Sequence, residues 1–173
     1  MLGLLLATSV AGVTITTGIG EIWYGERVPL GGYTERKGAL MEEGGGTVKA
    51  RVMVLKEGDT ALAIAVIDAL TIPESLVREV KKQLPPTLKL FLHATHTHSA
   101  PDSQMLNDRM TLSIPGIANY KRRMLDQVSS QIADLVKRTK DDAEGRTTVR
   151  SWRLKTTVPG LNRARRKLAS PDP

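Results

Sequence analysis

Two apolar runs separated by a helical segment constrain the fold of this chain more than any other feature. Ala61 to Ile67 is a continuous apolar run, and Leu88 to Leu92 is a shorter one. Between them, Thr71 to Glu74 has the form of a capping box with Thr71 as N-cap, and Pro85-Pro86 ends the helical pattern that follows. Strand, helix and strand in this order predict a right-handed crossover between two parallel strands.

A hairpin is predicted immediately before this crossover. Thr47 to Leu55 alternates apolar and more polar residues, which indicates a half-buried strand, and Lys56 to Asp59 indicates a turn. The run Ala61 to Ile67 is then the second strand of the hairpin. Because no polar residue interrupts it, we expect this strand to be buried on both faces.

The flanking segments extend the same sheet. Val13 to Thr17 alternates β-branched residues and predicts a strand, followed by an irregular region punctuated by glycines from Gly18 to Gly32. Asn119 to Thr139 carries apolar residues at helical intervals, which predicts a long amphipathic helix on the sheet with Asn119 as N-cap. Thr147 to Thr157 predicts a further strand.

These elements predict an α/β fold. It is a mixed β-sheet with flanking helices, built from a β-hairpin, a βαβ crossover and a long amphipathic helix, and we expect it to be a partial domain. Aromatic residues are 3% of the 173 residues, so aliphatic side chains must fill the core. The absence of cysteine excludes disulfides and thiolate metal sites.

All three histidines of the chain lie in one short stretch at the end of the second parallel strand. In extended geometry His96 and His98 share a face, whereas His93 faces the other way. Asp68 follows the first parallel strand, so its carboxylate is expected at the same edge of the sheet, where ligands bind in open α/β sheets. Imidazoles placed in this way bind a metal or handle a proton, and Asp68 is a candidate to orient one of them from the second shell of a metal site. The alternatives are histidines that satisfy local hydrogen bonds and an aspartate that caps the strand end.

The histidine stretch also carries a family resemblance. Ala94 to Pro101 reads A-T-H-T-H-S-A-P and resembles the A-T-H-T-H-S-G-P signature of the neutral, non-lysosomal ceramidases. Three further segments are similar in order and spacing, namely Gly31-Gly32-Tyr33, Lys49 to Leu55, and Leu161-Asn162-Arg163. The resemblance covers the chain from about Val13 to its C-terminus.

The resemblance implies a zinc-dependent amidohydrolase, with Zn²⁺ as its cofactor. It would cleave the N-acyl amide of ceramide or a related lipid to sphingosine and a fatty acid, by attack of a water that zinc activates. His96 would be a zinc ligand, and His98 and Arg163 would be catalytic residues that contact the reacting end of the substrate. The family completes its zinc shell with a histidine, a glutamate and a tyrosine from later in a longer chain. Residues 13–173 are therefore expected to be the N-terminal portion of a hydrolase domain, and the activity of this chain alone is uncertain.

The N-terminal residues 1–12 have two interpretations. Met1 to Val13 is apolar but shorter than the ~20 residues that span a bilayer, and it fits either a remnant of an export signal or a first strand. The cellular location is therefore unknown, and secretion or the periplasm is slightly favoured.

The formal net charge of +7 leaves a second class of function open. A non-catalytic basic domain would bind an anionic membrane surface or nucleic acid through its late lysines and arginines, among which Arg163 would be a solvated member. The chain lacks aromatic residues interleaved with these charges, so a nucleic-acid partner is not expected. The expected partner is a lipid-like amide, with peripheral contact to a membrane.

Overall fold

The structure is a computed structural model that describes residues 7–10, 13–24, 27–33, 48–110, 112–142, 145–146 and 149–152. The chain divides into two units. The smaller unit comprises Met1–Ala11 and Thr148–Pro173. Its described part is an antiparallel pair of strands, β1 (Ala7–Val10) and β7 (Val149–Trp152). The strand predicted over Thr147 to Thr157 thus has its described part in β7.

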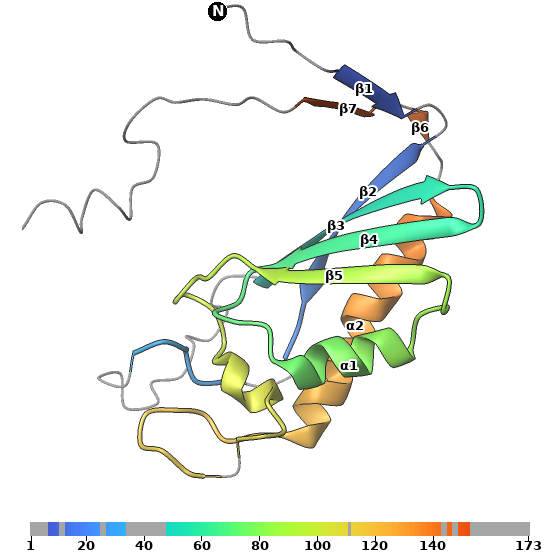
Figure 1. The fold of residues 1–173 in the computed structure, drawn as a ribbon. Coiled ribbons are helices and arrows are strands. Elements are labelled where there is room, and N and C mark those ends of the chain that lie inside the picture. The colour runs from blue at the N-terminus through green and yellow to red at the C-terminus, as the bar shows by residue number, and fades with distance from the viewer. Residues whose placement is uncertain are drawn as a thin grey trace, which may run out of the picture. The chain divides into compact units, whose positions relative to one another are not determined.

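The larger unit, Gly12–Thr147, is built on a five-stranded mixed sheet with the order β5-β4-β3-β2-β6 (Figure 1). Its strands are β2 (Thr14–Ile22), β3 (Val48–Glu57), β4 (Thr60–Ile67), β5 (Leu88–Ala94) and the short β6 (Gly145–Arg146). The pair β4 and β5 is parallel, and the other neighbours are antiparallel. The predicted α/β class, the hairpin and the parallel strand pair are confirmed.

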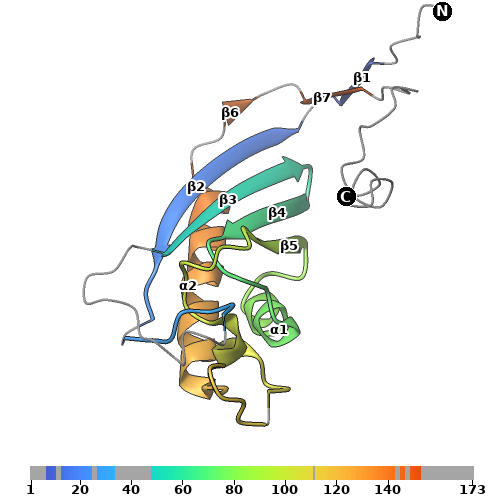
Figure 2. The ribbon, with the colours of Figure 1, turned by 90° about the vertical axis from the view of Figure 1, so that its left-hand side faces the viewer.

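Two helices lie on the same face of this sheet, as the two perpendicular views show (Figures 1 and 2). Helix α1 (Glu74–Lys82) belongs to the crossover between β4 and β5, and α2 (Arg122–Asp141) packs beneath the sheet. The predicted amphipathic pattern of α2 is confirmed, because its apolar residues from Met124 to Val136 are buried. They meet the alternate residues of β3 and β4 that point to the same side. The core therefore lies between the sheet and the two helices.

The opposite face of the sheet carries no helix within the described residues. It presents apolar side chains that are partly or largely exposed, including Leu62 of β4 (37%), Phe91 of β5 (56%) and Ile19 of β2 (70%). The expectation that β4 is buried on both faces is therefore wrong. Its burial alternates along the strand, because the helices of the described residues cover one side of it.

Strand β2 is longer than the sequence pattern indicates. The predicted irregular region begins at Gly18, whereas β2 continues through Gly18 and Gly20 to Ile22. Both glycines face α2. A Cβ at Gly18 would overlap the side chain of Thr139, and one at Gly20 would lie 3.0 Å from Leu135. Glycine therefore serves here to let α2 approach the strand, and not to break it.

Both helix starts differ from the predicted caps. Helix α1 begins after Pro73, and the Thr71 hydroxyl lies 2.6 Å from that of Ser103 in place of capping the helix. Helix α2 begins after Lys121 and not after Asn119. The backbone before α2 is held away from helical geometry, because Lys121 N–H donates to the Met105 carbonyl at 2.8 Å.

No described helix is long and apolar enough to cross a membrane.

Candidate functional site

The candidate site forms where the parallel strands β4 and β5 end. Beyond the last paired residues, Thr95 N–H donates to the Ile67 carbonyl at 2.9 Å, and Thr97 N–H donates to the Ala69 carbonyl at 3.2 Å. These bonds hold the segment after β5 alongside the segment after β4. The prediction that Asp68, His96 and His98 leave the sheet at one edge is confirmed, whereas His93 lies within β5.

His96 adopts a left-handed backbone conformation, with φ of 59°. The strand ends at Ala94, so the expectation of extended geometry through His98 is wrong. The His96 ring is exposed, and its Nδ1 lies 2.9 Å from the Leu70 carbonyl oxygen. A carbonyl oxygen only accepts, so Nδ1 is the donor, and in the neutral imidazole Nε2 then carries the lone pair.

The turn brings the two predicted site histidines together by another route. The ring centroids of His96 and His98 lie 5.4 Å apart, with the ring planes at 82° in an edge-to-face arrangement. His98 is half-buried, whereas His96 is exposed. The two imidazoles therefore differ in surroundings, which suits different chemical roles.

A segment far upstream forms the wall beside His98. The Tyr33 ring stacks on the imidazole with centroids 4.4 Å apart and planes at 28°. Gly32, with φ of 94°, lies against the same ring, and a Cβ there would overlap the imidazole. The sequence resemblance marks Gly31 to Tyr33 as a segment of interest, but no spacing rule relates it to His98.

His93 faces away from this site, as expected from strand alternation. Its ring lies 5.4 Å from that of Phe91, on the face of the sheet that carries no described helix. His93 is therefore not part of the candidate site, although it is close to His96 and His98 in sequence.

The Asp68 carboxylate pairs with Arg51 at the edge of the site. Arg51 donates to Oδ1 and Oδ2 of Asp68 at 3.3 and 3.4 Å, respectively. The group that orients His96 is the Leu70 carbonyl. The suggested role of Asp68, to orient a histidine that binds metal, stays a prediction.

The loop after the histidines is organised by Asp102, which the sequence analysis did not single out. Its carboxylate is buried and accepts from the N–H groups of Gln104 and Ala118, each at 3.0 Å. It caps the short 3₁₀ helix η2 (Ser103–Leu106) and ties the far end of the loop to its beginning. An aspartate side chain that accepts from the backbone N–H two residues later forms an Asx turn. This is a local pattern of loops that could have indicated the role of Asp102 from the sequence.

The described residues contain no group of three or more His, Asp or Glu side chains able to hold a metal ion. His96 fits one position of a zinc shell, since its Nδ1–H is already bonded to a carbonyl and Nε2 remains for the metal. Arg163, the other predicted catalytic residue, lies outside the described residues.

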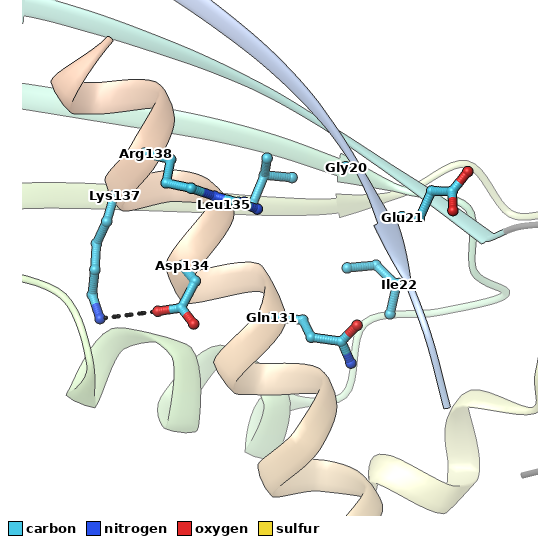
Figure 3. A pocket seen from close by; sticks show the side chains of 8 residues that line it. All are labelled: Gly20, Glu21, Ile22, Gln131, Asp134, Leu135, Lys137 and Arg138. Carbon is cyan, nitrogen blue, oxygen red and sulfur yellow. Dashed lines mark hydrogen bonds and ion pairs between the residues drawn. The ribbon is translucent and has the colours of Figure 1, made fainter. Parts of the chain in front are cut away.

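A separate groove between β2 and α2 contains none of the predicted site residues (Figure 3). Lys137 pairs with Asp134 at 3.4 Å along its helical side, and Gly20 to Ile22 line the strand side. Its charges are balanced, and we assign no chemistry to it.

Solved structures of ceramidases share this fold. A ceramidase complexed with C2 matches with a TM-score of 0.57 and 19% identity, covering 75% of this chain and 21% of that chain. The neutral ceramidase from Pseudomonas aeruginosa matches with a TM-score of 0.58 and 20% identity, covering 75% of this chain and 22% of that one. No protein-family model matches the chain, and no curated protein sequence matches it. The chain thus spans about a fifth of the length of the solved structures that it matches, and at this identity the likeness establishes the fold.

Proposed function

We propose, on the basis of the fold shared with neutral ceramidases, that this chain forms part of a zinc-dependent amidohydrolase. The proposed substrate is ceramide or a related lipid, cleaved at its N-acyl amide to sphingosine and a fatty acid. The single observation that carries the proposal is the paired arrangement of His96 and His98 at the carboxyl edge of β4 and β5. That edge is where an open α/β sheet presents its ligand-binding groups.

The bond from His96 Nδ1 to the Leu70 carbonyl supports a ligand role. Histidines that bind metals through one ring nitrogen commonly donate the other N–H to a carbonyl or carboxylate, which fixes the tautomer and the ring direction. His96 has this arrangement, with its Nδ1 2.9 Å from the Leu70 carbonyl oxygen. Zinc, when bound, supplies a Lewis acid that lowers the pKa of water to ~7 and so makes a nucleophile available at neutral pH.

His98 is proposed to act on the substrate. Its ring lies edge-to-face with His96 and is fixed on its other side by Tyr33. An N–H donor of His98 beside the reacting amide would offset the negative charge that develops on the amide oxygen during attack. Arg163 is proposed as a second donor to the same oxygen.

We propose that this chain contributes His96 to the metal shell and that the remaining ligands come from outside the described residues, which contain no group of three candidate ligands. A catalytic zinc site normally takes three protein ligands and one water. We expect this chain to bind zinc weakly and to hydrolyse little or no ceramide by itself. Peripheral contact with a membrane and a secreted or periplasmic location are parts of the proposal.

The alternative of a bare basic surface gains no support from the described residues. Arg122 pairs with Asp126 and Glu79, and Lys137 pairs with Asp134, so several cations of α2 are matched by carboxylates. Such pairing lowers the positive potential that binding to anionic lipid or nucleic acid requires.

A zinc titration followed by NMR tests the proposal on the chain itself. The three imidazoles give separate signals, and we expect those of His96 and His98 to respond at zinc concentrations that leave His93 unchanged. The variant His96→Asn should weaken zinc binding while keeping the turn, because Asn tolerates a positive φ. The matched control is His93→Asn, which should bind zinc as the original chain does. A zinc response centred on His93, or one that survives in His96→Asn, would contradict the proposal.

A further inference from the structure

The imidazole of His98 is enclosed by groups from two distant parts of the chain. The Tyr33 ring stacks on one face of the His98 ring, with a centroid distance of 4.4 Å. The His96 ring packs edge-to-face against the His98 ring, with a centroid distance of 5.4 Å. Stacked aromatic rings at such distances attract one another beyond the area that they bury. The ring direction of His98 is therefore set by its neighbours as well as by its own backbone.

The backbone fixes the position of Tyr33 relative to the histidine loop. Leu30 and Pro101 form an antiparallel bridge, with Gly31 N–H donating to the Ala100 carbonyl at 3.1 Å and Asp102 N–H donating to the Pro29 carbonyl at 2.8 Å. Val28 anchors the upstream end, because it is fully buried. Tyr33 follows this bridge by three residues, so its ring is delivered to His98 by a short, bonded connection.

Gly32 makes the close approach possible. Its φ of 94° is unfavourable for residues with a side chain, and a Cβ would overlap the His98 ring. Gly31 is similarly confined, since a Cβ there would lie 3.0 Å from the Asp102 Cα. Gly32 and Tyr33 thus both lie against the imidazole of His98, while Gly31 lets the same segment approach Asp102.

We propose that Tyr33 is a positioning residue, whose ring holds the His98 imidazole edge-on to that of His96. Gly32 has no side chain and so leaves the space that the His98 ring occupies in this arrangement. The purpose of the arrangement rests on the proposed hydrolase function, in which His98 must be aimed at the substrate oxygen. The arrangement itself is formed by contacts between residues of this chain.

NMR of the metal-free chain with labelled histidines tests the proposal. Tyr33→Leu should remove the ring-current shift of the His98 protons and its contacts to the Tyr33 ring, whereas Tyr33→Phe should retain both the ring-current shift and contacts to the new ring. The loss of one aromatic pair predicts a fall of about two- to tenfold in the ratio of the stacked to the unstacked orientation. Gly32→Ala should displace the His98 signal as well, and a failure of that variant to fold leaves the Tyr33 series decisive.

The pair Phe91 and His93 provides a matched internal control. Phe91→Leu should move the His93 signals and leave His98 unchanged, while Tyr33→Leu should do the opposite. Unchanged His98 signals in Tyr33→Leu would overturn the proposal, and so would a Tyr33→Phe variant that behaves as Tyr33→Leu does. Because no zinc is present, this outcome is independent of whether His96 binds metal.

Discussion

Replacing Asp102 should destabilise the protein more than replacing any exposed carboxylate, because its buried side chain accepts two backbone hydrogen bonds at once. The carboxylate is 3% exposed and accepts from Gln104 N–H and Ala118 N–H, each at 3.0 Å. Hydrogen bonds to a charged group contribute about 1.5–3 kcal/mol each. Asp102→Ala removes both acceptors and leaves the two amides without them, so we expect a loss of about 3–5 kcal/mol, the upper end being reduced by the relieved desolvation of the charge.

Asp102→Asn separates the two contributions. Its amide oxygen can still accept, but one of the two acceptor atoms is replaced by a donor, so about half of the loss is expected, roughly 1.5–3 kcal/mol. The assay is urea unfolding followed by far-ultraviolet circular dichroism, with the slope checked for constancy. The control is Asp134→Ala, which removes an exposed partner of Lys137 and should cost under about 1 kcal/mol. A value for Asp102→Ala within about 0.5 kcal/mol of the original protein would refute the reasoning.

Three further predictions concern the sheet, the pH dependence and the exposed face. Gly20→Val should cost about 1–3 kcal/mol in unfolding free energy, because its side chain would press on Leu135 of α2, and chemical denaturation measures this. A hydrogen bond from Lys82, with the nearby Arg122 and Arg78 guanidinium groups, holds the pKa of the Glu79 carboxyl below its usual range. Glu79 therefore stabilises the fold above the unfolded carboxyl pKa of ~4.3. This stabilisation is lost as the pH falls through the lower pKa of the folded state. Unfolding free energies measured down the acid range should therefore decline less steeply for Glu79→Gln than for the original chain; identical slopes would contradict this. Phe91→Thr on the exposed sheet face should change stability by under about 1 kcal/mol, and a thermal melt showing a core-sized loss would indicate that this face is covered in solution.

The strand arrangement was predictable because it depends on local patterns. Alternation in Thr47 to Leu55 and the apolar runs on either side of the helix decide the hairpin and the crossover, and both are present. The juxtaposition of Asp68 with the histidine stretch follows from the parallel pair alone. The prediction that β4 is buried on both faces was wrong, because the residue types of a strand indicate its hydrophobicity and not whether other elements pack on each face.

The inner details of the site were not predictable from spacing. The contact of Tyr33 with His98 joins residues that are distant in sequence, and it depends on the Leu30 to Pro101 bridge, which carries no alternation pattern. The left-handed turn at His96 has no glycine or asparagine to announce it. The proximity of His96 and His98 was predicted from extended geometry, in which residues two apart share a face of the strand. In the structure a turn at His96 brings the two rings together instead.

The backbone at His96 has a consequence for how this position can vary. Few side chains accept a left-handed conformation readily, and asparagine, aspartate and glycine are the usual substitutes. Drift at this site would therefore pass most easily through residues that preserve the turn and discard the imidazole. Under the proposed ligand role, such descendants would fold as this chain does yet lack that metal ligand, so the identity of residue 96 would separate the two groups.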